Sequence, residues 1–306
     1  MDRREKIGYA LTMFGGICWA FSGACGQFLF QNRGLSSDWL VSVRLTLAGL
    51  ILTVYSLLRW RGNVLSIFRT AKGVAGIVVF ALFGMAMCQY SFFRSIELSN
   101  AATATTLQYT GLVLVMLWLA LWDKRLPHRS EILAVVCAMA GAFLLATHGD
   151  PSQLVLSDKA LFWCMMGAIS FAVYSVQPRE MIVQYGTMPI TGIGMLIGGI
   201  VLCAVFKPWH VVGQWDIVTV SGLMYITVFG TICAFCCYLE GVRRIGAAKG
   251  SILAAIEPVA SAVLSVVWLG VPLGGMDISG IALIVAAMVL LAKDKGHEPD
   301  KNIEKT

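Results

Sequence analysis

The chain has 306 residues, of which 58% are hydrophobic and only 13% are charged. Soluble domains carry about 25% charged residues. The net charge of +6 comes from short basic clusters between apolar runs and forms no continuous basic patch, which argues against nucleic acid as a partner. Composition therefore excludes an ordinary soluble domain and predicts an integral membrane protein.

Ten apolar runs follow one another, each about as long as the roughly 18–25 residues that cross a bilayer as a helix. They lack the alternation of membrane β-strands, so we expect an all-α fold with ten transmembrane helices. The expected spans are 7–31, 38–59, 73–96, 100–122, 130–147, 158–178, 187–206, 216–240, 247–269 and 275–292. The basic start of the first run also suits a signal peptide, but its long apolar part favours an uncleaved helix.

The distribution of basic residues predicts the topology. With ten spans, 18 of the 23 Lys and Arg residues fall on the side of the two termini, 4 fall on the other side, and Arg44 lies within a span. Because cytoplasmic loops carry the excess of basic residues, both termini are expected in the cytoplasm, with the protein in the inner or plasma membrane. The polar residues 294–306 are expected to form a disordered cytoplasmic tail.

The chain also contains an internal repeat. With an offset of 147 residues, the run Leu98–Leu126 aligns with Ile245–Leu273, and a similar offset aligns the first span with the sixth. We therefore expect one repeat in residues 1–150 and a second in residues 151–293. Five spans per repeat force the second repeat to enter the membrane from the opposite side, which gives the inverted repeats of secondary transporters.

Several motifs carry a family resemblance. They are the run RRIGAAKGSILAAIEPV at 243–259, the LGVPL exit at 269–273, Ser99-Asn-Ala-Ala, Leu107-Gln-Tyr and Arg44-Leu. The chain resembles the EamA-type ten-helix members of the drug/metabolite transporter superfamily over about residues 7–292. The resemblance implies a secondary transporter with a central cavity between the two halves that exports amino acids or related metabolites. Gly111 departs from the pattern, because the family usually has proline there.

Two stripes of residues at helical spacing are candidates for the cavity wall. The sixth span presents Trp163, Ser170, Tyr174 and Gln177 on one face, and the first span presents a companion stripe that includes Trp19 and Gln27. Aromatic faces with a few hydrogen-bonding groups suit a small organic solute. The alternative is close helix packing by the small residues of the stripes, with the aromatic rings filling the core. We favour the cavity for Trp163, Tyr174 and Trp19.

Polar residues of the third, fourth and eighth spans are further candidates. We place Tyr90 and Tyr109 on the cavity, whereas Gln89 and Gln108 suit either the cavity or hydrogen bonds between helices. The same expectation includes two more residues, Thr105 and Tyr238. Buried polar groups in a membrane normally face the bundle interior, because lipid offers them no partner.

Two charged residues and one proline lie deep in the apolar runs. A charged side chain at the bilayer centre costs about 2.5–3.5 kcal/mol on insertion scales. Arg44 could bind a substrate carboxylate, but we favour a side chain that reaches the outer interface or pairs with a helix end. Glu257 could exchange protons during transport, but we favour a structural role beside the helix break that Pro258 introduces.

These observations predict a secondary transporter of a small organic metabolite that works by alternating access, with export of an amino acid or related compound as the preferred function. Importers of vitamin- or nucleotide-like solutes and drug efflux carriers are alternatives with the same fold. The sequence contains no nucleotide-binding motif, so the expected partners are the solute, the lipid bilayer and a proton or solute gradient; the oligomeric state stays open. We expect no catalytic, metal or cofactor site, which disfavours a membrane enzyme, and the repeat disfavours a non-transporting membrane protein.

Overall fold

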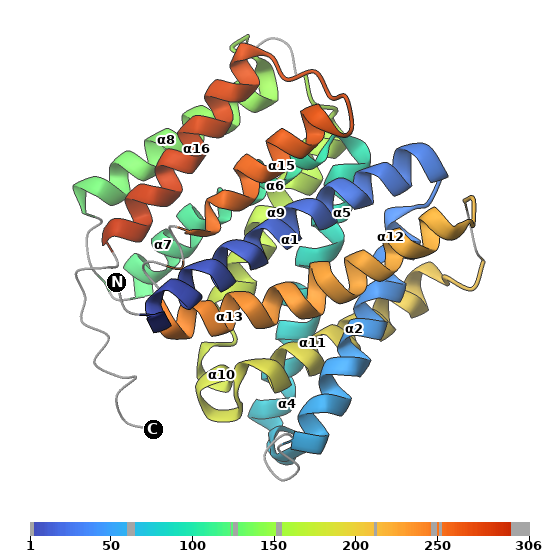
Figure 1. Cartoon of the computed structure of the whole chain (residues 1–306). Helices are drawn as coiled ribbons and strands as arrows, with labels where there is room; N and C mark the ends of the chain where they lie inside the picture. The colour runs from blue at the N-terminus through green and yellow to red at the C-terminus, as the bar shows by residue number, and fades with distance from the viewer. Residues whose placement is uncertain are drawn as a thin grey trace.

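The computed structural model describes residues 3–59, 65–122, 124, 128–150, 155–210, 213–245, 250 and 253–294. Throughout these ranges the chain is built from helices and short connections (Figure 1). The helices of the first half are α1 (Arg3–Arg33), α2 (Ser37–Arg59), η1 (Leu65–Arg69), α4 (Ala71–Val79), η2 (Phe80–Ala86), α5 (Met87–Leu98), α6 (Ala101–Gln108), α7 (Gly111–Trp122) and α8 (Arg129–Thr147). Those of the second half are α9 (Asp158–Val176), α10 (Arg179–Tyr185), α11 (Thr187–Phe206), α12 (Ile217–Thr227), η3 (Val228–Cys233), α13 (Ala234–Ile245), α15 (Ile256–Val267) and α16 (Gly275–Asp294).

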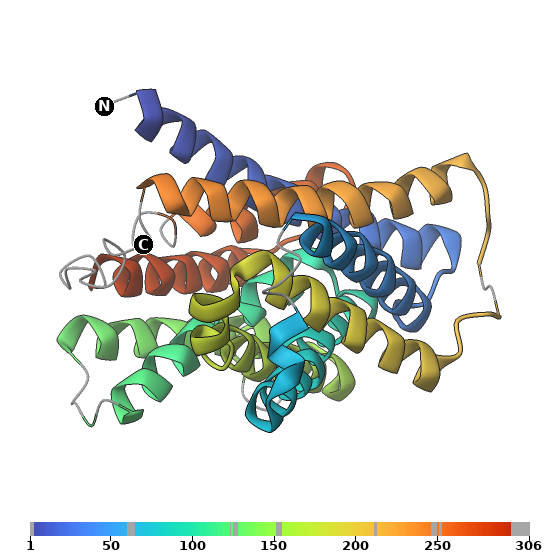
Figure 2. The ribbon, with the colours of Figure 1, turned by 90° about the horizontal axis from the view of Figure 1, so that it is seen from below.

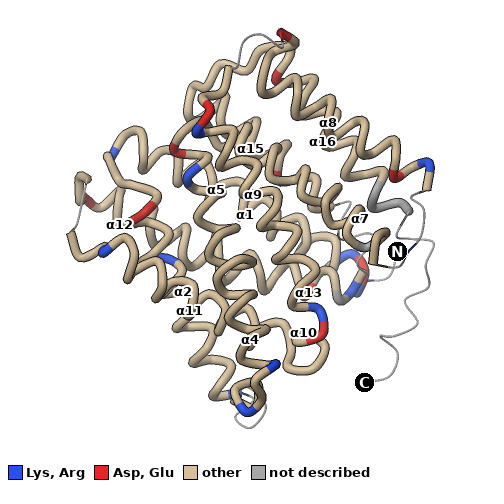
Figure 3. Tube along the Cα trace, turned by 180° about the vertical axis from the view of Figure 1, so that it is seen from behind, with Lys and Arg blue, Asp and Glu red and all other residues tan. Residues whose placement is uncertain are grey.

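Eight helical stretches of the described chain are long and apolar enough to cross a membrane, and two shorter apolar helices, Ile256–Val267 and Gly275–Leu290, follow them. The expected all-α membrane fold with ten passages is confirmed. The start of α1 and the end of α16 lie at the same end of the bundle, as an even number of passages requires (Figure 2). Charged residues gather near the ends of the helices (Figure 3). Beyond Asp294, the tail expected at 294–306 lies outside the described residues.

The packing of the helices follows the internal repeat. Helix α1 packs along α13 and α15, and its counterpart α9 packs along α5 and against α6 and α7. Helix α2 packs along its own counterpart α11, and α8 packs along α16. All of these contacts join one half to the other, and exchanging the two halves converts the contacts of α1 into those of α9, as expected for two related five-helix halves.

The third and eighth passages are irregular at corresponding positions. Residues Phe80–Ala86 (η2) and Val228–Cys233 (η3) form π-helical segments between regular α-helices. The first residues of the two segments are separated by 148 positions, close to the repeat offset. Because π-helical turns are rare and frequently mark functional sites, their pairing draws attention to the region between them.

The fourth and ninth passages are broken. A turn at Tyr109 and Thr110 separates α6 from α7, and a turn at Ala255 precedes α15. Proline is tolerated at Pro258 because this residue lies in the first turn of α15, where its missing N–H has no partner within the helix. Gly111 follows the break of the fourth passage without a proline. A Cβ atom at Gly111 would lie 2.5 Å from the carbonyl oxygen of Ala168, so glycine allows α7 to approach α9.

Helices α2 and α11 meet at backbone distance. A Cβ atom at Gly49 would lie 2.6 Å from the Cα atom of Leu196, and one at Gly199 would lie 2.5 Å from the backbone nitrogen of Thr46. Small residues permit such approaches in membranes, where close van der Waals contact stabilises helix association. This close contact fixes the two halves together along one side of the bundle.

Helix α12 begins with a charged cap, Asp216, which lies one residue before the apolar stretch Ile217–Val242 of the structure. The Asp216 carboxylate accepts a hydrogen bond from the backbone N–H of Thr219 at 2.8 Å. This bond lowers the pKa of Asp216 below its ordinary value, and Arg33, 3.3 Å away, acts in the same direction. The pair connects the end of α1 to the start of α12.

Candidate functional site

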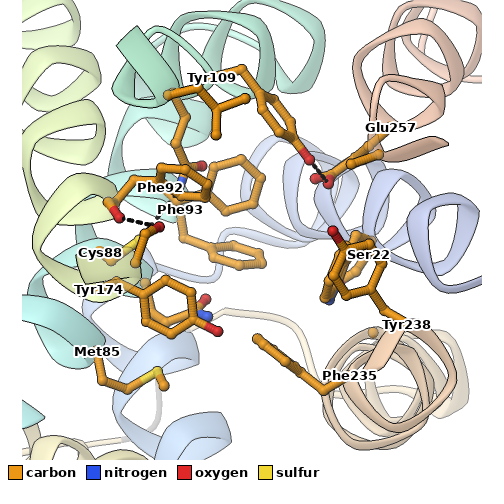
Figure 4. A pocket seen from close by; sticks show the side chains of 18 of the residues that line it. Ser22, Met85, Cys88, Phe92, Phe93, Tyr109, Tyr174, Phe235, Tyr238 and Glu257 are labelled. Carbon is orange, nitrogen blue, oxygen red and sulfur yellow. Dashed lines mark hydrogen bonds between the residues drawn. The ribbon is translucent and has the colours of Figure 1, made fainter. Parts of the chain in front are cut away.

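A central cavity of about 300 Å³ lies between the two halves, a volume at the lower end of small-molecule sites. Both halves contribute to its wall, including η2, η3 and the residues next to the helix breaks. Side chains of several helices point toward the same space (Figure 4). The lining residues are Trp19, Ser22, Arg44, Met85, Cys88, Gln89, Phe92, Phe93, Gln108, Tyr109, Leu112, Phe171, Tyr174, Ser175, Gly230, Phe235, Tyr238, Leu239, Ala254 and Glu257.

Aromatic rings make up much of this wall. The ring centroid of Trp19 lies 5.1 Å from that of Phe235 and 5.1 Å from that of Tyr238. On α9, the ring centroid of Tyr174 lies 6.3 Å from that of Phe171. Offset and edge-on contacts of this kind hold aromatic rings in place at favourable geometry. The wall therefore offers rigid apolar faces to a solute.

Arg44 is the buried cation of the cavity, with only 2% of its surface exposed. Its Nη2 donates to Oε1 of Gln89 at 2.6 Å, its Nη1 donates to Oγ1 of Thr231 at 3.4 Å, and the guanidinium lies 4.4 Å from the ring centroid of Phe93. The expectation that Arg44 reaches the outer interface is wrong. The side chain turns inward because α5 and η3 present acceptors and a ring there, whereas lipid offers none.

Glu257 is the buried carboxylate of the same cavity and is 8% exposed. Its Oε2 accepts a hydrogen bond of 2.5 Å from the hydroxyl of Tyr109 (Figure 4). One turn further along α15, the hydroxyl of Ser261 lies 3.3 Å from that of Thr105 on α6. Glu257 thus joins the break of the ninth passage to that of the fourth.

Six of the twelve residues expected to line the cavity do so. They are Trp19, Gln89, Gln108, Tyr109, Tyr174 and Tyr238, and both charged candidates, Arg44 and Glu257, accompany them. Gln108 also donates to the Cys88 sulfur at 3.3 Å, which orients its amide at the wall.

The structure places three of the remaining polar candidates in bonds to the backbone. Gln27 is fully buried and accepts from the backbone N–H of Ala101 at 2.7 Å. The Ser170 hydroxyl donates to the carbonyl of Met166 one turn earlier, and the Gln177 amide donates to the carbonyl of Gly76. These groups satisfy buried backbone atoms at helix ends and contacts, which a periodic pattern does not distinguish from a cavity wall.

Three further candidates pack between helices. The Tyr90 hydroxyl donates to Asp38 at 2.8 Å, and its ring contacts that of Trp163 with centroids 5.1 Å apart. Thr105 faces Ser261 instead of the cavity. Core packing therefore describes Trp163 better than the favoured cavity wall, and a hydrogen bond between helices describes Tyr90 better. Pro258 is buried behind the wall.

The prediction missed several lining residues that share a face with predicted ones. Ser22 follows Trp19 by three positions, Phe92 follows Gln89 by three, and Phe235 precedes Tyr238 by three. Residues three or four positions apart lie on the same side of a helix. Adding the residues one helical turn away from each predicted cavity residue would have identified these three.

Polar contacts hold one end of the bundle together, where α1 ends and α2 begins. The indole N–H of Trp39 donates to the carbonyl of Pro208 at 2.8 Å, and the hydroxyl of Ser37 donates to Glu97 at 2.6 Å. Glu97 also forms an ion pair with Arg94. Contacts from both halves thus close this end.

Comparison of the sequence with known protein families identifies the family of this chain. The EamA-like transporter family matches residues 6–147 and again residues 158–293. The chain belongs to the EamA-like transporter family. It is a multi-pass membrane transporter of the drug/metabolite transporter superfamily, and the resemblance seen in the sequence is confirmed.

Relatives of this EamA-type chain include bacterial transporters. It is 34% identical over 291 residues to the uncharacterized inner membrane transporter YicL of Salmonella typhimurium, covering 94% of this chain and 96% of that one. It is 25% identical to the threonine/homoserine exporter RhtA of the same species, covering 80% of this chain and 78% of RhtA. A solved crystal structure, 18% identical, superimposes with a TM-score of 0.60 and covers 95% of this chain and 98% of its own; it shows the fold alone.

Proposed function

We propose that this EamA-type transporter exports a small organic metabolite, an amino acid or a related compound, by alternating access. The observation that carries the proposal is the cavity between the two halves, whose wall combines aromatic rings with the buried cation Arg44 and the buried carboxylate Glu257. The named activity of the relative RhtA, threonine and homoserine export, supports the same substrate class.

Alternating access requires two halves that rearrange around a fixed site. The paired π-helical segments and the two helix breaks all lie at or beside the cavity, where local changes of backbone geometry would reshape its wall. The contacts at the end where α1 meets α2 are single hydrogen bonds and ion pairs, which opening could exchange for water. This combination supports a carrier that exposes its cavity to one side at a time.

The proposed topology places both termini in the cytoplasm, with residues 1–150 and 151–293 as two inverted halves. The excess of Lys and Arg on the side of the termini supports this orientation. The end closed by Trp39 and Pro208 then faces away from the cytoplasm. Cysteine-accessibility labelling of loop positions in intact cells tests the orientation, since labelling of a position in loop 207–216 by a membrane-impermeant reagent is expected.

An ion or solute gradient drives transport in this proposal. Glu257 could exchange protons with the cavity, and its alternative role is to hold Tyr109 across the two helix breaks. A Glu257→Gln variant separates the two roles in liposomes with an imposed pH gradient. Loss of the gradient's effect with retained exchange of solute supports proton coupling, whereas an unchanged gradient effect excludes Glu257 as the coupling group.

The experiment that tests the function is a ligand screen followed by counterflow. Purified protein is screened by thermal shift against amino acids, amines, vitamins and nucleotide derivatives, and each stabilising compound is then tested in proteoliposomes loaded with the same compound. Amino acids are expected to stabilise the protein and to exchange. Exchange of only amines or only vitamins would instead establish one of the alternative carriers, and the absence of any exchange would support a non-transporting protein or an enzyme.

A further inference from the structure

Two opposite charges share the cavity without neutralising one another. Arg44 and Glu257 both line it, and each is more than nine-tenths buried. Among the described residues, no carboxylate lies within 4.0 Å of the Arg44 guanidinium, and no basic nitrogen lies within that distance of Glu257. Buried charges are normally paired, because burying a charge without a partner costs several kcal/mol. Among the described residues, both Arg44 and Glu257 thus lack the charged partner that a buried charge normally has.

Arg44 retains unused capacity for an anion. A guanidinium has five N–H donors, and among the described residues only two neutral acceptors, Gln89 and Thr231, receive hydrogen bonds from it. Its Nε is buried without an acceptor in the described part of the chain. The ring of Phe93 holds the guanidinium from one face and leaves its edge for hydrogen bonding. A carboxylate is the ligand that this planar group binds with two parallel bonds.

Glu257 retains unused capacity for a cation. The hydroxyl of Tyr109 donates to Oε2, while no described residue donates to Oε1. Tyr238 and Trp19 pack against each other on the same wall and present aromatic faces. An ammonium group gains both from a carboxylate and from aromatic faces within about 6 Å. This corner of the cavity thus suits a primary amine.

We propose that the cavity binds a zwitterionic α-amino acid, with its carboxylate on Arg44 and its ammonium on Glu257. The inference rests on the proposed function and specifies its substrate. Such a solute supplies both missing counter-charges at once, whereas an amine leaves Arg44 unpaired and a carboxylic acid leaves Glu257 unpaired. Arg44 and Glu257 together therefore select the zwitterionic amino acid over the amine and over the carboxylic acid.

The rest of the wall restricts the side chain of this amino acid. Met85, Leu112, Phe171 and Phe235 are apolar, and among the residues that the structure describes no third ionised side chain lines the cavity. A lysine or glutamate substrate would bring a third charge into the cavity without a partner. Neutral amino acids are thus the expected substrates, with apolar or hydroxyl side chains that the aromatic wall and Ser22 can contact.

The first test uses the wild-type protein and three matched ligands. Leucine, isoamylamine and 4-methylpentanoate share one side chain, but the second lacks the carboxylate and the third lacks the amine. Thermal-shift titration is expected to give a dissociation constant for leucine, or for another neutral amino acid identified by the screen, at least about tenfold below those of its two analogues. Binding of either analogue as tight as that of the amino acid overturns the proposal.

The second test uses neutral variants of the two residues. In Arg44→Gln, the preference for the amino acid over the amine is expected to disappear while the preference over the acid remains; Glu257→Gln should show the reverse. Glu131→Gln is the matched control, because Glu131 is buried at the start of α8 and does not line the cavity. If both cavity variants keep both preferences, the assignment of the two charges is wrong.

The outcomes separate this inference from the proposed function. Exchange of amino acids by a protein whose selectivity ignores both substitutions retains the function and rejects the dipolar site. A wild-type protein that binds and exchanges no amino acid rejects both. Should a variant fail to fold, the wild-type ligand series still decides, and Arg44→Lys provides a second variant that keeps the charge but loses the bidentate geometry.

Discussion

The contact between α2 and α11 provides a sharp test of the fold, through the substitution Gly49→Ala. An added Cβ would lie 2.6 Å from the Cα of Leu196 and 2.7 Å from the carbonyl carbon of Met195. Both neighbours are backbone atoms, so no side chain can rotate away. Ordinary contacts of a Cβ atom begin near 3.4 Å, and the helices must therefore separate by several tenths of an ångström or more.

This separation determines the magnitude of the effect. A gap of about 0.5–1 Å loses a quarter to a half of the attraction between the atoms that it separates, and inserting a methyl group into a packed interior typically costs about 1–3 kcal/mol. The greater helix propensity of alanine opposes this by up to about 1 kcal/mol. We expect a net loss of about 1–2 kcal/mol, which corresponds to a fall of several degrees in the unfolding temperature.

The assay is thermal unfolding in detergent, with Gly167→Ala as the matched control. A Cβ atom at Gly167 would meet the Cβ of Ser91 at 3.7 Å, an ordinary contact, so the control gains helix propensity without a clash. The difference between the two variants isolates the cost of separating α2 from α11. An unfolding temperature of Gly49→Ala equal to or above that of Gly167→Ala would refute the close packing of these helices.

Three further predictions concern other parts of the molecule. Because the backbone N–H of His128 donates to Glu131 at the start of α8, Glu131→Ala should cost about 1 kcal/mol of stability in thermal unfolding without changing transport. Tyr174→Ala should weaken binding of the transported solute at least about tenfold, whereas Trp163→Ala, which lies off the wall, should lower the unfolding temperature and leave that affinity unchanged. The pKa of Asp216 is lower in the folded state than its ordinary value. The stability that Asp216 contributes is therefore present above the ordinary pKa and is lost as the pH falls through the folded-state pKa. Below pH 4, wild type should lose stability faster than Asp216→Asn.

The arrangement of helices was largely predictable, because the length of apolar runs and the position of basic residues reflect the bilayer directly. The interruptions within the helices were harder to predict from the sequence. Neither Phe80–Ala86 nor Val228–Cys233 contains a proline that would announce a π-helical segment. The break at Tyr109 likewise forms without the proline that the family usually has nearby, because backbone geometry there depends on contacts with α9 and α15.

The site was predictable by residue type but only partly by face. Helical spacing placed Trp163 and Tyr174 on one stripe, yet only Tyr174 lines the cavity, because α9 faces the cavity near one end and packs against Tyr90 near the other. Helical spacing shows which residues share one face of a helix. It does not show where along that helix a neighbouring helix ends and the cavity begins. Arg44 shows the same limit, since its inward orientation depends on acceptors supplied by Gln89 and by a residue far along the chain.

The most direct test of transport through the cavity is counterflow of an amino acid identified by the ligand screen, in liposomes containing wild type, Ala254→Trp or Ala254→Ser. Ala254 lines the cavity, so tryptophan at this position would occupy it and serine would leave it open. Wild type and Ala254→Ser are expected to accumulate labelled amino acid transiently, and a folded Ala254→Trp is expected to accumulate none. Undiminished counterflow by Ala254→Trp would contradict a path through this cavity.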